Sequence, residues 1–305
     1  MNTTELHIPS NKVRDIERYC LTTLHEQYPE GEIRSFINIL FEAFLGWDTA
    51  HLLLHRDDTI NQSDLLNFHW AVEDLKRYRP IQHIIGYTDF CSCRIGVGPE
   101  VLIPRPETEQ LVNLLLHPDR DANYSESYSI VASNNSTNSH PCRILDLCTG
   151  SGCIAIALAK HLPNAQVEAI DISEEALMRA KANASTNNVT IDFRQADLLH
   201  WRANDWQDYD LIVSNPPYVL GTERLDHNVM DYEPHNALFV PENDPLLFYR
   251  TIAELAQQHL HGVLALEINE NLGTETSNLL NSYGFKTTLL NDFRDKDRFI
   301  IATKH

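Results

Sequence analysis

The stretch RILDLCTGSGCIAIA, residues 143–157, decides the fold. Its first five residues are mostly apolar and predict a buried strand, Arg143–Leu147, and its last residues begin a helix predicted at 152–161. Between the two lie Gly150 and Gly152, which let a ligand approach the backbone, and the helix N-terminus offers free N–H groups there. A strand, a glycine-rich turn and a helix in this order predict a cofactor-binding α/β domain.

The rest of the chain after residue 143 continues the alternation of strand and helix. Such alternation predicts a parallel, doubly wound sheet that binds its ligands at the carboxyl ends of the strands. Further strands are predicted at 167–170, 191–195, 211–214, 262–268, 286–291 and 299–303, and further helices at 174–186, 245–260 and 273–282.

The sequence before residue 143 has a different pattern. Residues 11–78 read as helices with apolar stripes at three-to-four spacing, and Ser63 is the predicted N-cap of one of them. Strand signals follow at 81–103, and Pro106 is predicted to begin another helix. Residues 118–141 are rich in Ser and Asn and predict a mobile insertion.

The glycine turn alone leaves the cofactor open. Gly150-x-Gly152 followed by Asp171 about twenty residues later also fits a dinucleotide fingerprint, and a glycine turn can be purely structural. Asp146 favours a cationic amino-acid group over a pyrophosphate, which an acid repels. Asp171 suits a ribose diol, or could merely cap the next helix, and Asp197 could read an adenine edge.

The run Asn215-Pro216-Pro217-Tyr218 follows an apolar strand, where ligands are expected. The prolines have no N–H to donate, so their backbone offers only carbonyl acceptors, and the Asn215 side chain adds another. Tyr218 offers a flat face for stacking. The run therefore suits a planar NH2 group, such as a side-chain amide or the exocyclic amine of a base.

Composition limits the partners. The formal net charge of −19 disfavours a stable complex with nucleic acid, and no apolar run is long enough to span a bilayer. The six cysteines lack the spacing of a disulfide framework or a zinc site, so reduced thiols in a cytoplasm are expected. We expect no metal site, because the histidines lack close carboxylate or thiolate partners.

In these motifs the sequence resembles the PrmC (HemK) family of protein-(glutamine-N5) methyltransferases. Members of this family act on the GGQ motif of class-1 peptide chain release factors. The resemblance rests on the run VLIPRPETE at 101–109, the loop at 146–152, residues 171–173, the Asn215–Tyr218 motif, residues 232–234 and 237–238, and residues 266–268. The sequence departs from the family pattern in four places: Cys148 and Asn269 stand where glycines are expected, His261-Gly262 replaces a Gly-Gly turn, and the insertion at 118–141 is longer than expected.

The resemblance implies a class I methyltransferase domain (Rossmann-like, seven-stranded, mostly parallel) at 105–305, a β-hairpin linker at 80–104 and a helical substrate-recognition domain at 1–79. It implies S-adenosylmethionine as cofactor and class-1 release factors as partners. The residues expected to bind the cofactor are Asp146, Cys148, Thr149, Gly150, Ser151, Gly152, Asp171, Asp197, Leu198 and Asn215. The target glutamine is expected at Asn215, Pro216, Pro217 and Tyr218, with Asn215, Pro216 and Tyr218 as the catalytic residues.

Two alternatives stay open at this point. One is a DNA or RNA methyltransferase that acts on an exocyclic amine, against which the acidic charge counts. The other is a cofactor-binding protein that has lost catalysis, against which the intact motif at 215–218 counts.

Overall fold

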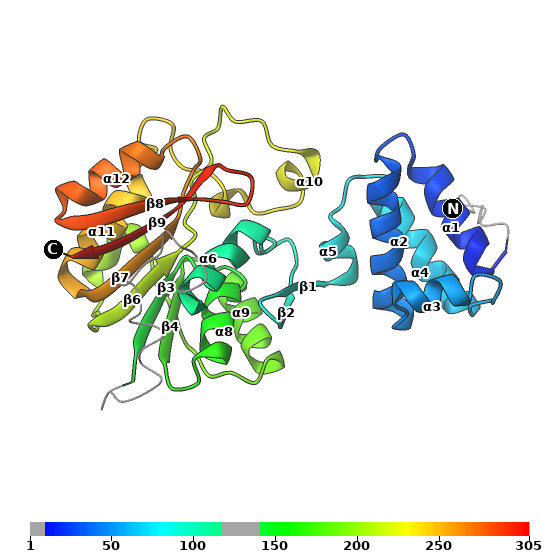
Figure 1. Ribbon diagram of the computed structural model, residues 1–305, viewed down its shortest axis with the longest axis horizontal. Helices are drawn as coiled ribbons and strands as arrows, with labels where there is room; N and C mark the ends of the chain where they lie inside the picture. The colour runs from blue at the N-terminus through cyan, green and yellow to red at the C-terminus, as the bar shows by residue number, and fades with distance from the viewer. Residues whose placement is uncertain (1–9, 118–140, 305) are drawn as a thin grey trace. The chain divides into compact units, whose positions relative to one another are not determined.

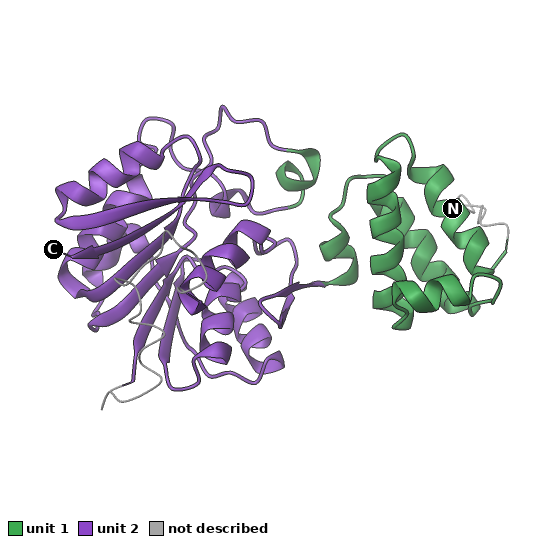
Figure 2. Cartoon of the chain, in the orientation of Figure 1, with its two compact units in different colours: residues 1–86, 226–232 green, residues 87–225, 233–305 purple. Residues whose placement is uncertain are grey.

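The computed structural model describes residues 10–117 and 141–304. Within these limits the chain forms two compact units (Figure 2). The first comprises the chain up to Gly86 together with 226–232, and the second comprises 87–225 and the remainder from Glu233. The predicted insertion at 118–141 lies outside the described residues except for Pro141.

The first unit is helical, as predicted. Its apolar stripes form one buried cluster that includes Phe41, Phe68 and Leu75. The predicted cap at Ser63 is wrong: Asn61 caps the helix by accepting from the backbone N–H of Asp64 (2.8 Å), because it is the residue with extended backbone angles. The helices are α1 (Val13–Leu24), α2 (Glu30–Leu45), α3 (Thr49–Leu54), α4 (Gln62–Leu75) and α5 (Ile81–Ile85).

A distant segment completes this unit. Residues 226–232 contain the short helix α10 (His227–Met230). The Tyr232 hydroxyl donates to the backbone carbonyl of Arg77 (2.8 Å), and the rings of His227 and Tyr78 lie 5.6 Å apart. The segment belongs by its contacts to the helical unit, although it follows the 215–218 motif in sequence.

The expected linker at 80–104 is corrected in two ways. Its first part is the helix α5, ended by Gly86 in the left-handed conformation, rather than strand. The hairpin is β1 (Tyr87–Phe90) with β2 (Cys93–Gly96), and it belongs to the second unit. Asn183 fastens it there, because its side chain accepts from Gly96 N (2.8 Å) and donates to Gly96 O (3.0 Å). The boundary between the units therefore lies at 86/87 instead of 79/80.

The second unit is built on a seven-stranded sheet in the order β5-β4-β3-β6-β7-β9-β8 (Figure 1). Five strands are parallel and β9 runs antiparallel to both its neighbours. Every predicted strand after residue 143 is present. They are β3 (Arg143–Leu147), β4 (Gln166–Asp171), β5 (Asp192–Gln195), β6 (Tyr209–Ser214), β7 (Leu260–Glu267), β8 (Phe285–Asn291) and β9 (Asp297–Lys304).

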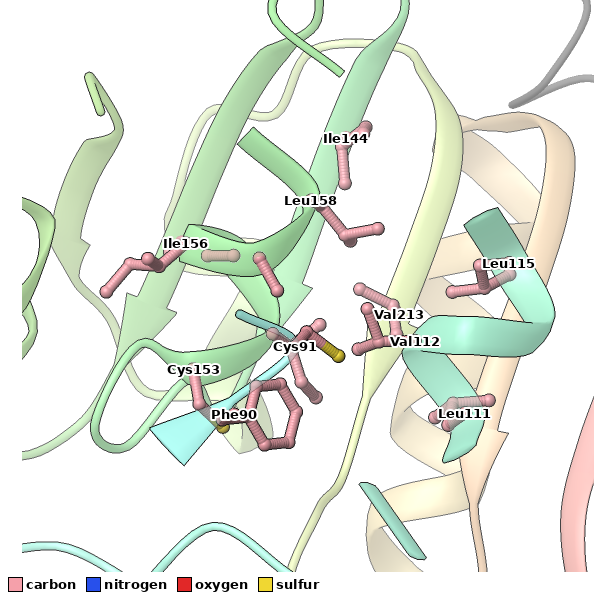
Figure 3. Packing of buried hydrophobic residues seen from close by; sticks show 14 of the residues in the cluster. Phe90, Cys91, Leu111, Val112, Leu115, Ile144, Cys153, Ile156, Leu158 and Val213 are labelled. Carbon is pink, nitrogen blue, oxygen red and sulfur yellow. The ribbon is translucent and has the colours of Figure 1, made fainter. Parts of the chain in front are cut away.

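Helices cover both faces of the sheet. Successive residues of a strand point to opposite faces, so each strand contributes side chains to both layers of helices. Ile144 and Val213 face a cluster with α6 and α8 (Figure 3), whereas Leu145 and Ile212 face α11 and α12. Burial on both faces explains why these strands are continuously apolar. The helices are α6 (Pro106–Leu116), α8 (Cys153–His161), α9 (Glu174–Thr186), α11 (Leu247–His259) and α12 (Gly273–Ser282), and the predicted ones are confirmed.

Candidate functional site

The loop after β3 turns sharply to begin α8. Gly150 and Gly152 have φ of 52° and 81°, and a Cβ on Gly152 would lie 3.0 Å from the Cβ of Ala180. Cys148 also adopts a left-handed conformation, with φ of 59°. That conformation costs a residue with a side chain about 1–2 kcal/mol, so the expected glycine would be less strained there.

Asp171 ends β4 beside this loop. Its carboxylate accepts from the backbone N–H groups of Gly150 (2.8 Å) and Ser173 (3.0 Å). The cap of α9 is Ser173, whose hydroxyl accepts from Ala176 N (3.1 Å). The interpretation of Asp171 as a helix cap is therefore set aside, and its remaining lone pairs stay available at the cavity.

Asp146 lies behind the loop and is completely buried. Its Oδ2 accepts from the hydroxyl of Thr149 (2.5 Å) and from Ala155 N (3.3 Å), while Oδ1 has no partner among the described residues. Burial raises the pKa of Asp146 to about 7, and nearby Asp171 adds to the shift. A cation placed close to this carboxyl group would stabilise its ionised form.

Asp197 follows β5 and begins a short 3-10 helix, Leu198–Ala203. Its Oδ1 accepts from Leu199 N (2.9 Å), and its Oδ2 lies 2.6 Å from Nδ1 of His200. Asp197 and Leu198 both line the cavity, as expected. The adenine contact expected of Asp197 stays a prediction: each carboxylate oxygen has one partner in the chain and keeps a lone pair for a further donor.

A cavity of about 340 Å³ lies at the carboxyl ends of β3, β4 and β6. Most expected cofactor residues line it: Cys148, Thr149, Gly150, Ser151, Asp171, Asp197, Leu198 and Asn215. Asp146 and Gly152 do not line it, and direct contact of Asp146 with a cofactor stays a prediction. No separate role was predicted for two further parts of the cavity wall, which are Glu100, Val101, Leu102, Pro104 and Thr108, and then Pro234, Asn236, Ala237 and Phe239.

The motif at 215–218 follows β6, as predicted, but its four residues are placed differently. Asn215 and Pro217 line the cavity, whereas Pro216 and Tyr218 do not. The Asn215 amide nitrogen donates to the hydroxyl of Thr108 (3.1 Å), and the Tyr218 hydroxyl donates to the buried Glu267 (2.9 Å). Stacking of Tyr218 on a substrate stays a prediction.

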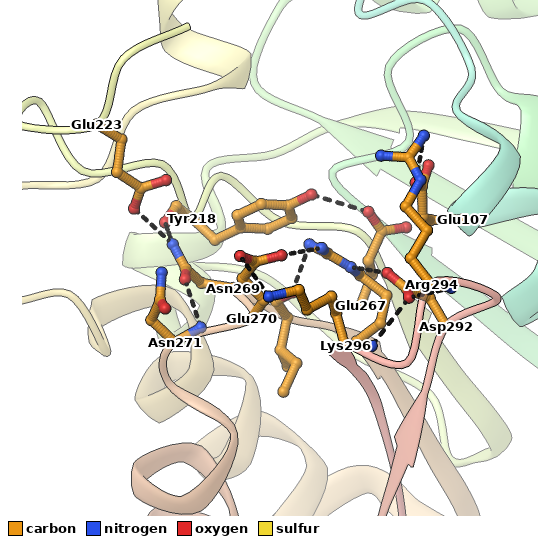
Figure 4. Close-up of polar contacts among 12 residues, drawn as sticks. Glu107, Tyr218, Glu223, Glu267, Asn269, Glu270, Asn271, Asp292, Arg294 and Lys296 are labelled. Carbon is orange, nitrogen blue, oxygen red and sulfur yellow. Dashed lines mark hydrogen bonds and ion pairs between the residues drawn. The ribbon is translucent and has the colours of Figure 1, made fainter.

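The strand end of β7 supports the motif from behind (Figure 4). The Asn269 side-chain amide, 2% exposed, donates to the carbonyl of Tyr218 (3.1 Å) and to Glu223 (2.8 Å). Asn269, which stands where a glycine was expected, thus holds the backbone at the last residue of the motif. Glu233 joins two other parts of the cavity wall, because it accepts from the guanidinium of Arg105 (2.6 Å) and from Ile103 N (3.1 Å).

The cavity carries a negative field. Burial raises the pKa of the Cys148 thiol well above its usual value, and the neighbouring Asp171, Asp146 and Asp197 raise it further. A cation would be stabilised there, whereas a pyrophosphate would be repelled. Among the described residues, no group of three His, Cys, Asp or Glu side chains is arranged to hold a metal ion, and no helix could cross a membrane.

Sequence profiles and known relatives match most of the chain. The sequence profile of the methyltransferase small domain matches residues 129–232, and that of the PrmC N-terminal domain matches residues 18–86. The chain is 45% identical to the release factor glutamine methyltransferase of Flavobacterium psychrophilum over 90% of this chain and 92% of the relative. It is 37% identical to that of Bacteroides thetaiotaomicron over 95% and 99%. A solved ribosomal protein L11 methylase from Lactobacillus delbrueckii is 23% identical, with a TM-score of 0.43 and coverage of 68% and 83%.

Proposed function

The chain belongs to the release factor glutamine methyltransferase family, and from that premise we propose that its cavity and its 215–218 motif together methylate a release-factor glutamine. The acceptor is the side-chain amide nitrogen of the glutamine in the GGQ motif of class-1 release factors. The observation that carries the proposal is the fixed amide of Asn215 at the edge of the acidic cavity.

The cavity suits S-adenosylmethionine, the methyl donor of the family. When bound, this cofactor supplies an electrophilic methyl group on a positively charged sulfur. Asp171 and the loop from Cys148 to Ser151 line the cavity, where Asp171 would accept from a ribose diol and the loop would meet the amino-acid part. The unpartnered Oδ1 of Asp146 provides negative charge behind that loop.

The motif has to make a poor nucleophile reactive, because an amide nitrogen shares its lone pair with its carbonyl. Asn215 Oδ1 and the Pro216 carbonyl would each accept one hydrogen of the substrate NH2. Two acceptors fix the plane of the amide and direct its nitrogen into the cavity. Holding the two reactants in line supplies much of the rate, up to roughly 7–11 kcal/mol for well-oriented pairs.

Selection of one glutamine among many needs a second contact surface, since every glutamine presents the same NH2 group. We assign that surface to the helical unit, which matches the PrmC N-terminal profile and whose described residues do not line the cavity. Leu66 and Trp70 lie one turn apart on α4 and are 38% and 58% exposed. Large apolar side chains left exposed in this way are typical of binding surfaces.

Methyl transfer from labelled S-adenosylmethionine tests the proposal. The purified chain is incubated with a class-1 release factor, with the same factor carrying Ala in place of the GGQ glutamine, or with DNA or RNA. We expect label in the first sample alone, located by mass spectrometry on the glutamine side chain. Label in the nucleic acid would favour an exocyclic-amine methyltransferase, and label in none would favour a binding protein without catalysis.

A further inference from the structure

We infer that Glu267, acting through Thr108, determines that the oxygen of the Asn215 side-chain amide, rather than its NH2 group, points toward the substrate. This inference rests on the proposed function. It makes Glu267 a positioning residue, because its carboxylate reaches Asn215 only through the hydroxyl group of Thr108. The three residues come from the ends of different elements: Thr108 from the first turn of α6, Asn215 from the end of β6, and Glu267 from the end of β7.

The three side chains form a continuous chain of hydrogen bonds. The Asn215 amide nitrogen donates to Thr108 Oγ1 at 3.1 Å, and the Thr108 hydroxyl donates to Glu267 Oε2 at 2.7 Å. Thr108 is 2% exposed and Glu267 is 1% exposed, so the bond between these two side chains is shielded from bulk solvent.

A count of hydrogens fixes the orientation of the amide. A hydroxyl has one hydrogen, and a carboxylate can only accept, so the Thr108 hydrogen is committed to Glu267. The Thr108 oxygen can then only accept, and only the NH2 side of Asn215 can donate to it. The oxygen of the Asn215 amide is thereby held on the other side, where it can accept from the substrate NH2. Without Glu267 the Thr108 hydroxyl could donate to Asn215, and the amide could turn over.

The same carboxylate also holds the far end of the motif. The Tyr218 hydroxyl donates to Glu267 Oε1 at 2.9 Å (Figure 4). Burial, together with the charge of Glu267, raises the pKa of Tyr218 well above its usual value, so this hydroxyl stays a donor. Burial raises the pKa of Glu267 above its usual value. Its hydrogen bonds from Thr108 and Tyr218 and the charge of Arg298 oppose this shift and favour the accepting form. Both outer residues of the motif are thus oriented by one buried carboxylate.

The simpler alternative is that these bonds only fasten α6 to β7. The two roles differ in what a variant loses. A fastening role affects the free energy of unfolding and leaves turnover of the folded enzyme unchanged. An orienting role lowers kcat, changes the Kd of S-adenosylmethionine little, and depends on the hydroxyl rather than on side-chain volume.

The test compares Thr108→Val, which keeps the shape without the hydroxyl, with Thr108→Ser, which keeps the hydroxyl. We expect Thr108→Val to lower kcat on full-length release factor by about tenfold to a hundredfold, the scale of a misplaced reacting group. Thr108→Ser should stay within about threefold of wild type, since it retains the hydrogen-bonding group. Glu267→Gln keeps the volume and should lower kcat to a similar extent; it replaces Thr108→Val if that variant does not fold.

The matched control is Thr276→Val, because Thr276 is a completely buried threonine whose hydroxyl has no partner among the described residues. It should leave kcat unchanged. Wild-type kcat in both Thr108→Val and Glu267→Gln would overturn the inference while leaving the proposed function intact. Failure of the wild-type enzyme itself to methylate release factor would instead refute the proposed function.

A second measurement tests the inference without turnover. The side-chain NH2 signal of Asn215 is assigned by its loss in Asn215→Ala and followed by 15N NMR in the folded enzyme. We expect the signal to shift and its hydrogens to exchange faster in Thr108→Val and Glu267→Gln, but not in Thr108→Ser. An unchanged signal in the first two variants would overturn the inference whatever the activity.

Discussion

The carboxylate of Asp171 accepts a hydrogen bond from the backbone N–H of Gly150 at 2.8 Å. This bond joins the end of β4 to the glycine loop that follows β3, although the residues are 21 positions apart. A group that holds both the loop and a ribose would link the shape of the cavity to cofactor binding. Substitution of Asp171 should therefore weaken cofactor binding.

Asp171→Ala should weaken S-adenosylmethionine binding by about 1.5–3 kcal/mol, the contribution of charge-assisted hydrogen bonds. Calorimetry measures the dissociation constant directly. The exposed Asp205, substituted by Ala, removes the same net charge from a residue outside the cavity wall and should leave the constant unchanged. An unaltered constant in Asp171→Ala would exclude a ribose-binding role.

Asn215→Ala should reduce methyl transfer by at least about a hundredfold, since it removes one polar contact made to the reacting group. Cofactor affinity should change less, because the glycine loop and Asp171 remain. Single-turnover kinetics with saturating S-adenosylmethionine separates the two effects. Asn278→Ala, an exposed position on α12, is the matched control. Near-normal turnover in Asn215→Ala would remove this residue from the mechanism.

Local signals in the sequence were sufficient to predict most strands and helices of the second unit. The strand at Arg143–Leu147 and the helices at 174–186 and 273–282 were predicted at their observed bounds, because apolar periodicity and turn residues act over a few positions. The strand signals at 81–85 misled, because a short apolar run does not distinguish a buried strand from one turn of helix.

The candidate site was predicted as far as its motifs are contiguous. The loop after β3, Asp171 and Asn215 all line the cavity. The support of the motif could not be predicted from spacing, because Thr108 and Glu267 are 159 positions apart and meet only when α6 packs on the end of β7. Both residues lie in stretches that resemble the family, yet their contact is a property of the folded sheet.

The helical unit should contribute to recognition of the release factor and not to chemistry. Leu66→Ser combined with Trp70→Ser should raise the KM for full-length release factor about tenfold or more, the effect of losing one well-packed anchor. The KM for a short peptide around the glutamine should not change. Met178→Ser, also highly exposed but on α9, is the control. An unchanged KM for the full-length factor would show that a different surface recognises the release factor.

The fourth prediction concerns Asp146 and pH. Burial raises its pKa from 3.8 to about 7, so folding favours the protonated carboxyl. Its contribution to stability is therefore full below about pH 4 and is lost as the pH rises through about 7. Without cofactor, the Tm should fall between about pH 5 and pH 8. Asp146→Asn stays uncharged, and its Tm should fall less over that range.

Cofactor binding should depend on the same group with the opposite sign. S-adenosylmethionine brings positive charge, which favours the ionised carboxylate of Asp146 and lowers its pKa in the complex. Affinity should consequently rise between about pH 5 and pH 8, with release of a proton that calorimetry in buffers of different ionisation enthalpy detects. Every other titratable group is shared by the two proteins, so the difference in pH dependence between wild type and Asp146→Asn isolates Asp146. Equal pH slopes in the two proteins, for both Tm and affinity, would show that the charge behind the loop takes no part in binding.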